Sequence, residues 1–213
     1  MATNPYVERF PVNATLPEHG RPRAEILAEL HAMATEEDAF WETGKCSGTM
    51  YCGDHDHYGF MNEAFGLFAH VNVLQRDMCP SATKMEGEII AMVLDVLHGE
   101  AVTDAKPGGI VTTGGTGSIL HSMLAYREWG DQQRGITKAN VIKPETAHPA
   151  FDKGCHLFDI EVRRAPVDPQ TTEVDVDWVR DHIDANTVAL VGSACNYGYG
   201  TIDPIAELSD VAL

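Results

Sequence analysis

The sequence has few basic residues and no long apolar run. Only 15 of its 213 residues are lysine or arginine, against 32 aspartates and glutamates, so the formal net charge is -17. Binding to nucleic-acid phosphates or to an anionic membrane needs clustered basic side chains, and this balance argues against both. No apolar stretch approaches the roughly 20 residues that a membrane-spanning helix requires. We therefore expect a soluble protein with an acidic surface and no transmembrane segment.

Cysteines are also few, and their spacing forms no known motif. The five cysteines are an odd number and include no Cys-x-x-Cys pair: Cys46, Cys52, Cys79, Cys155 and Cys195. Free thiols are typical of a reducing compartment. The N-terminal stretch, residues 1–23, lacks the apolar segment of a secretory signal. Both features predict a cytoplasmic location.

The pattern of predicted elements changes near residue 100. Before it, an extended arm at 1–22 is followed by amphipathic runs that predict helices at 24–41, 58–73 and 84–98, with Gly99 placed to end the last one. After it, short β-rich runs alternate with helical ones. The strand-like runs lie at 109–113, 139–143, 160–166 and 187–194. The expected domains are therefore an N-terminal arm and helical segment, 1–100, and an α/β segment, 101–213.

This alternation predicts the fold class. Strands joined by helices at such spacing form right-handed crossovers, and these give a mainly parallel sheet with helices on both faces. The expected helices follow the glycine-rich stretch at 114–118, surround 149–158, start at Asp175 or Asp177, and start at Asp203-Pro204. The last one continues to Leu213 without a cap, so we expect an incomplete α/β domain that packs against residues outside this chain.

The sharpest signal for chemistry is TTGGTGS, residues 112–118, a glycine-rich turn between a strand-like run and a helix. Such a turn directs backbone N–H groups to one point, where the helix dipole also favours negative charge. The turn therefore predicts a phosphate cradle, with hydroxyls from Thr116 and Ser118. The alternative is a tight turn in which Thr116 or Ser118 is the N-cap. A dinucleotide fingerprint fails because Leu120 replaces its third glycine, and no Gly-Lys-Ser/Thr follows to complete a P-loop.

His148 follows the run at 139–143, at the strand end where α/β sheets place ligands. An imidazole there can stack on an aromatic cofactor or move a proton near neutral pH. The alternative is a capping or solvated histidine. The Asp-His-Asp-His stretch at 54–57 has metal-ligating residue types, but without a second cluster we expect no metal site. Cys195 is expected to be a small buried residue rather than a ligand contact.

Taken together, these segments resemble the sphingosine-1-phosphate lyase branch of the decarboxylase superfamily that depends on pyridoxal 5'-phosphate (PLP). The matching stretches occur in the family's order from Leu16 onward: LPEHGRPRAEILAEL, SGTMYCGD, KMEGEIIAMVLDVLHG, TTGGTGSILHSMLAYREW, ETAHPAFDKG and GYGTIDPIAEL. The resemblance implies the fold type I of PLP-dependent transferases, PLP as cofactor, and a homodimer with active sites at the subunit interface. It also implies a lyase that cleaves a phosphorylated sphingoid base into a fatty aldehyde and phosphoethanolamine.

The resemblance further implies roles for single residues. By matched position, Gly115 and Thr116 would hold the PLP phosphate, with Ser118 close by. His148 would stack on the pyridine ring and serve as the catalytic residue of this chain. The substrate's own phosphate would contact Tyr51 and Gln75. Gln75 stands where the family has a histidine, and it can donate a hydrogen bond but carries no charge.

Some of the implied machinery is absent from these residues. The family's lysine that binds PLP follows a histidine, and no lysine in this sequence does. The resemblance places that lysine, and the aspartate for the pyridine nitrogen, beyond Leu213. We therefore expect the 213 residues alone to be inactive and to need the remaining half, in the same or another chain. The alternatives are a PLP-dependent amino-acid decarboxylase and a non-catalytic remnant of the fold; the SGTMY segment favours the lyase.

Overall fold

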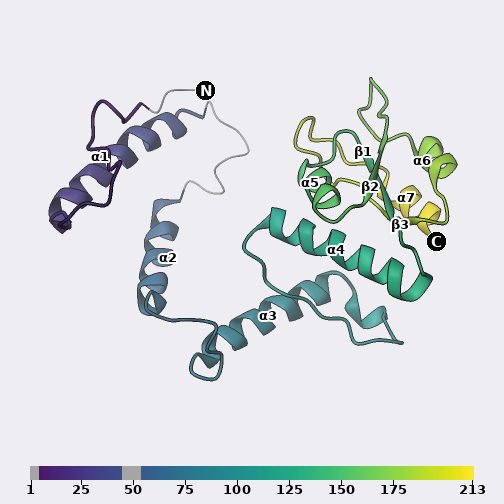
Figure 1. Cartoon of the computed structure of the whole chain (residues 1–213), viewed down its shortest axis with the longest axis horizontal. Helices are drawn as coiled ribbons and strands as arrows, with labels where there is room; N and C mark the ends of the chain where they lie inside the picture. The colour runs from purple at the N-terminus through teal and green to yellow at the C-terminus, as the bar shows by residue number, and fades with distance from the viewer. Residues whose placement is uncertain (1–4, 45–53) are drawn as a thin grey trace. The chain divides into compact units, whose positions relative to one another are not determined.

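The structure is a computed structural model that describes residues 5–44 and 54–213. The chain divides into two compact units, 1–70 and 71–213 (Figure 1). The sequence suggested a boundary after residue 100, and that domain division stays a prediction. Within the described ranges, no helix is both long enough and apolar enough to cross a lipid bilayer.

In the described residues of the first unit there are two helices, α1 (Arg23–Trp41) and α2 (His55–Phe68). The arm before α1 is tied to it, because Arg9 forms two hydrogen bonds with the Glu36 carboxylate, at 3.1 and 2.7 Å. The predicted helix at 24–41 is confirmed. The second helix begins three residues earlier than predicted, since Asp54 is its N-cap and accepts hydrogen bonds from the backbone N–H groups of Asp56 and His57.

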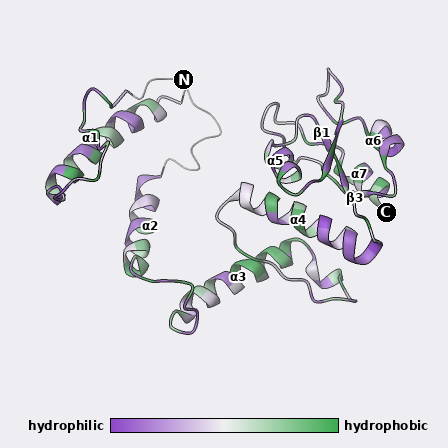
Figure 2. Ribbon diagram, viewed as in Figure 1, coloured by the Kyte–Doolittle hydropathy of each residue, from purple (hydrophilic) through white to green (hydrophobic). Residues whose placement is uncertain are grey.

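The second unit begins with α3 (Pro80–Val96) and a short 3-10 helix, η1 (Gly99–Ala101). Gly99 was predicted to be the residue that ends this helix, but α3 ends one residue earlier than that: its C-cap is Leu97, and His98 takes the left-handed conformation that follows, with φ 55°. Gly99 is suited to its place for another reason: a Cβ there would lie 3.2 Å from the Leu94 carbonyl. Apolar residues run along much of α3 (Figure 2), yet none of its residues is buried.

The rest of the second unit is a three-stranded parallel sheet with helices (Figure 1). The strands are β1 (Asn140–Pro144), β2 (Glu161–Ala165) and β3 (Thr187–Leu190), in the order β2-β1-β3. The helices are α4 (Gly115–Arg134), α5 (Ala150–Leu157), α6 (Val176–His182) and α7 (Ile205–Ala212). The predicted α/β class and parallel pairing are confirmed.

Two apolar clusters cover the two faces of the sheet. Val141 and Ile142 are neighbours on β1, and their side chains enter different clusters because successive residues of a strand point to opposite faces. One cluster includes residues of α4 and α5: Met123, Ile136, Ala139, Val141, Ala147, Cys155, Ile160, Val188 and Val191. The other includes residues of α6 and α7: Ile142, Ala165, Val174, Val176, Val179 and Leu208. Helices therefore lie on both faces, as the sequence predicted.

The run at 109–113 was predicted to be a strand, and this was wrong. Ile110 and Val111 are 63% and 50% exposed, and no strand of the described residues lies beside them. The Val111 N–H group donates instead to the Glu86 carboxylate, at 3.2 Å. An extended run becomes a strand only when a second backbone pairs with it, and here a side chain takes that place.

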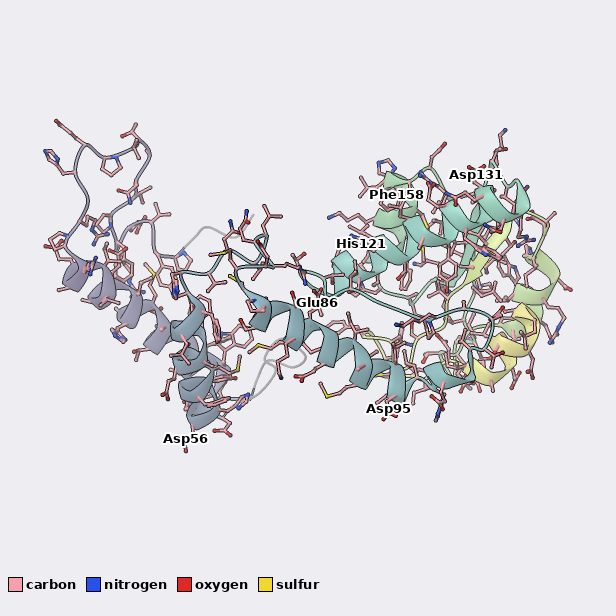
Figure 3. All side chains as sticks on the ribbon, turned by 90° about the horizontal axis from the view of Figure 1, so that it is seen from below. Asp56, Glu86, Asp95, His121, Asp131 and Phe158 are labelled. Carbon is pink, nitrogen blue, oxygen red and sulfur yellow. The ribbon has the colours of Figure 1, made fainter. Side chains whose placement is uncertain are left out.

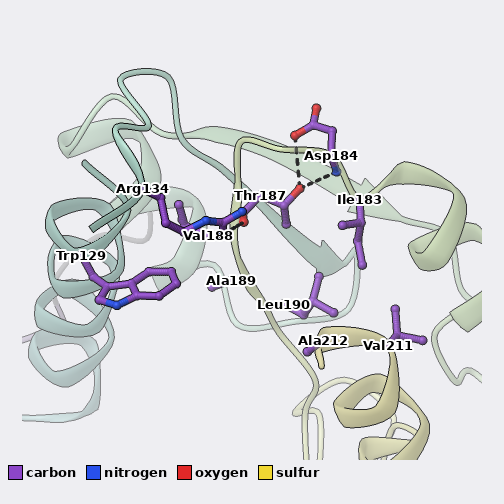
Figure 4. Close-up of a pocket in the computed structure, with 10 residues that line it drawn as sticks. All are labelled: Trp129, Arg134, Ile183, Asp184, Thr187, Val188, Ala189, Leu190, Val211 and Ala212. Atoms are coloured by element: carbon purple, nitrogen blue, oxygen red, sulfur yellow. Dashed lines mark hydrogen bonds between the residues drawn. The ribbon is translucent and has the colours of Figure 1, made fainter. Parts of the chain in front are cut away.

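The outer edge of β3 is free among the described residues, because β3 pairs only with β1. This edge lines a pocket together with Trp129 and Arg134 of α4 and Val211 and Ala212 of α7 (Figure 4).

Candidate active site

The candidate site lies at the carboxyl edge of the sheet. The 145–149 loop leaves β1 at this edge, and the loop that contains 194–199 follows β3 at the same edge. The far end of α4 lies at the opposite edge, since the Arg134 guanidinium donates to the carbonyls of Ala185 and Thr187 where β3 begins. Figure 3 shows His121 near the start of α4 and Asp131 towards its end. The start of α4, with the 112–118 turn, is therefore directed to the carboxyl edge.

The first three backbone N–H groups of α4 have no protein acceptor among the described residues. Gly114 is the N-cap of α4 and has φ 147° and ψ 169°, a combination that is essentially confined to glycine. The first amide of the helix with an acceptor is that of Ser118, which donates to the Gly114 carbonyl at 3.0 Å. Among the described residues, the N–H groups of Gly115, Thr116 and Gly117 have none. Thr116 or Ser118 as N-cap is therefore wrong, and the open amides suit an anion.

The hydroxyl groups of Thr112 and Ser118 stabilise the turn. The Thr112 hydroxyl donates to the Gly114 carbonyl at 3.0 Å and lies 2.6 Å from the Ser118 hydroxyl. Ser118 thus holds the shape of the turn in addition to lying near the free amides. Sequence reasoning missed Thr112, although a threonine two residues before a glycine is a known turn-forming signal.

His148 is exposed at the same edge, directly before α5. Its Nδ1 accepts the N–H group of Ala150 at 3.1 Å. A ring nitrogen that accepts a hydrogen bond carries no proton, so the neutral ring carries its proton on Nε2. The expected alternative, a capping histidine, is therefore real, and it fixes the tautomer while leaving Nε2 outside the cap.

Of the two residues predicted to contact a substrate phosphate, the structure describes only Gln75. Tyr51 lies outside the described residues. Gln75 is exposed, in the loop before α3. The Glu86 carboxylate bonds both the neighbouring Arg76 and the Val111 N–H group, so this loop is joined to the segment that leads into the 112–118 turn. The Arg76 guanidinium holds the pKa of Glu86 below its usual value.

The other candidates that the sequence offered are the 54–57 stretch, as a metal site, and Cys195. Within the described ranges, no group of three or more histidine, cysteine or acidic side chains is arranged to hold a metal ion, and His55 of the 54–57 stretch lies 3.0 Å from the Glu42 carboxylate. Cys195 was expected to be buried and is exposed, because β3 ends at Leu190 and leaves 195 in a loop. Among the cysteines that the structure describes, Cys155 is the buried one, and burial raises the pKa of its thiol to about 11.

Comparison with known proteins gives a consistent set of relatives. No protein-family model matches the chain. The chain is 40% identical over 195 residues to a sphingosine-1-phosphate lyase of Drosophila melanogaster, a match that covers 92% of this chain and 35% of that protein. It is 32% identical over 205 residues to a probable L-tyrosine/L-aspartate decarboxylase of Methanosarcina barkeri, covering 92% of this chain and 50% of that protein.

A solved structure shows the same fold. The sphingosine-1-phosphate lyase of Burkholderia pseudomallei is 56% identical and superimposes with a TM-score of 0.93, over 99% of this chain and 49% of that one. The chain thus spans about half the length of this lyase and about a third of the length of the Drosophila protein.

Proposed function

We propose that this chain, which belongs to the sphingosine-1-phosphate lyase family and corresponds to its N-terminal part, supplies part of the active site of a PLP-dependent lyase. The substrate would be a phosphorylated sphingoid base, cleaved to a fatty aldehyde and phosphoethanolamine. Within the same proposal, the sites lie at the interface of a cytoplasmic homodimer, and the remaining half of the enzyme completes them.

The observation that carries the proposal is the open start of α4. Three backbone N–H groups there have no acceptor among the described residues. They lie at the N-terminus of a 20-residue helix, where the helix dipole favours an anion. A Cβ added at Gly114 or Gly115 would meet nothing within 4 Å, so the space before the turn admits a phosphate. The residues present therefore fit the phosphate end of PLP.

The chain's residues would have distinct tasks. When bound, PLP supplies an electron sink for the pair of electrons released as the substrate's carbon–carbon bond breaks. The amides of Gly115 and Thr116 would bind its phosphate, and Ser118, bonded to Thr112, would keep the turn in shape. His148 would pack on the ring, with Nε2 left to exchange a proton because Nδ1 is used by the α5 cap.

The phosphate of the substrate would need a second anion site. We assign it to Tyr51 and Gln75. Support for Gln75 comes from the Glu86 carboxylate, which joins its loop to the segment preceding the phosphate turn. A neutral amide attracts a dianion less strongly than a protonated histidine does, so we expect weaker substrate binding than a histidine would give.

An amino-acid decarboxylase is the second candidate. It is favoured by the 32% identity to the Methanosarcina protein, half of which the chain covers. Both candidates would use the same phosphate turn and the same histidine, but they release different products.

Product analysis separates the two candidates. The complete polypeptide that carries these residues is incubated with PLP and either sphingosine 1-phosphate or the amino acids tyrosine and aspartate. We expect a long-chain aldehyde from the lipid and no carbon dioxide from the amino acids. If carbon dioxide forms without aldehyde, the lyase proposal is wrong and the decarboxylase is the function. If no product forms from any of the substrates, both proposals are wrong. The 213-residue chain alone is expected to give no aldehyde, and no borohydride-trapped PLP on any of its lysines.

A further inference from the structure

Two buried polar atoms of the described residues have no hydrogen-bond partner, and both lie at the carboxyl edge of the sheet. They are the hydroxyl oxygen of Thr146 and the side-chain nitrogen, Nδ2, of Asn196. Thr146 follows β1, two residues before His148, and Asn196 follows β3, the strand beside β1. Buried polar groups in folded proteins are almost always paired, so two unpaired ones on adjacent loops call for a common explanation.

The rest of Asn196 is firmly held. Its backbone N–H group donates to the Thr201 carbonyl at 2.9 Å, and its carbonyl accepts from Gly200 at 3.0 Å. Its side-chain oxygen accepts the N–H group of Tyr199 at 2.9 Å. An atom that accepts from a backbone N–H group must be the amide oxygen, so this bond also fixes which end of the side chain is Nδ2. The residue is only 3% exposed, and its unpaired part is purely a donor.

A second buried asparagine, at the opposite edge, shows how the fold treats an amide that serves stability. Asn140 is fully buried at the start of β1. Its Nδ2 donates to Asp184 at 2.8 Å, and its oxygen accepts the Thr187 hydroxyl at 2.8 Å. The two asparagines lie on adjacent strands or their loops and are equally enclosed, yet only the one at the candidate site keeps an open donor.

We propose that Asn196 is a cofactor-binding residue whose Nδ2 donates a hydrogen bond to the ring oxygen at position 3 of PLP. This inference rests on the proposed function. The phosphate of PLP is already matched by the amides at the start of α4, and the protonated pyridine nitrogen needs an acceptor rather than a donor. The ring oxygen is the remaining group that requires a donor. Of the two unpaired buried groups at this edge, the Thr146 hydroxyl can donate or accept, whereas Nδ2 of Asn196 can only donate, so we assign Asn196 to the ring oxygen.

The test compares PLP with 3-deoxypyridoxal 5'-phosphate, which lacks that oxygen. Dissociation constants for both are measured by calorimetry on the complete protein, as wild type, Asn196→Ala and Asn140→Ala. We expect the wild type to prefer PLP by about 10-fold, the ratio for one hydrogen bond to an ionised acceptor. Asn196→Ala should bind the two compounds equally, and Asn140→Ala should keep the wild-type ratio.

Each result has one meaning. If the wild type binds the two compounds equally, the inference is wrong. This comparison uses no variant, so it decides the question even if Asn196→Ala does not fold. A PLP preference that survives in Asn196→Ala also overturns the inference, while leaving the proposed function intact. Absence of binding of either compound to the wild type overturns the proposed function and this inference together. Ligand-free melting adds a second readout, in which Asn140→Ala should melt lower than Asn196→Ala.

Discussion

At the amino edge of the sheet, the polar side chains around Asp184 bond to one another, whereas at the carboxyl edge two side-chain groups and the first three N–H groups of α4 have no partner among the described residues. Asp184 accepts from Asn140 and from the Asn186 N–H group, both at 2.8 Å, and pairs with Arg163 at 2.7 Å. Figure 4 shows its bonds to Thr187. The first three N–H groups of α4 and Nδ2 of Asn196 have no such acceptor among the described residues. Closed networks stabilise a fold, and open donors are available to a ligand. The carboxyl edge also has bonded groups, since Asp152 pairs with Lys143 at 2.7 Å and with Arg164, but it is the edge where the open donors lie.

The largest effect should come from His148 at the carboxyl edge. In the complete enzyme, His148→Ala should lower kcat/KM by about 10²- to 10⁴-fold, the range for losing a residue that moves a proton. Its stability should fall by at most about 1 kcal/mol, because only the cap of α5 is lost. His156→Ala is the matched control and should keep full activity, because His156 is an exposed histidine on α5, the helix that His148 precedes. Unchanged kinetics of His148→Ala would remove His148 from the site.

The amino edge should respond in the opposite way. Asn140→Ala should lower the free energy of unfolding by about 2 to 3 kcal/mol, since it removes two buried hydrogen bonds and leaves the Thr187 hydroxyl only its longer bond to Asp184, at 3.4 Å. Denaturant unfolding measures the change. Phosphate affinity, measured separately under native conditions, should stay at the wild-type value. A variant that lost phosphate affinity while keeping its stability would contradict the division between the two edges.

The phosphate turn offers a smaller, local test. Gly114→Ala should cost about 1 to 2 kcal/mol of stability, because a residue with a Cβ rarely adopts φ 147°. It should also weaken binding of inorganic phosphate, since the turn must move to relieve that strain. Gly135→Ala is the control: Gly135 also has a positive φ, 66°, but it ends α4 at the amino edge. Both variants should lose stability, and calorimetry should show weaker phosphate binding for Gly114→Ala alone.

The smallest effect concerns acid. Hydrogen bonds from Asn140 and Arg163 lower the pKa of Asp184 from 3.8 to about 2. A carboxyl whose pKa is lower in the folded state stabilises the protein above its unfolded pKa and loses that contribution as pH falls through the folded one. Stability should therefore drop between pH 3.8 and about 2. Asp184→Asn should flatten this part of the curve, and Asp181→Asn, an exposed neighbour, should not. Equal curves for the three proteins would show that Asp184 is not linked to folding.

The sequence predicts the parallel strands well because short β-branched runs between helices have few other uses. It fails where structure depends on a neighbour far along the chain. The run at 109–113 has the composition of a strand but no partner strand in the part of the chain that the structure describes. Cys195 is exposed because β3 stops four residues earlier than its apolar run suggested. The turn at 112–118 could be predicted from its glycines. The open donor of Asn196 could not, since it is defined by what surrounds it.

The edge of β3 that is unpaired among the described residues affects how this chain behaves in solution. An unpaired strand edge is a template on which an extended segment of another copy can add. The net charge of -17 opposes such contact, because like-charged copies repel one another. At 0.1 M salt, the repulsion between charges more than about 10 Å apart is largely screened. Light scattering of the chain should therefore rise with ionic strength, the reverse of what an assembly held by ion pairs would show.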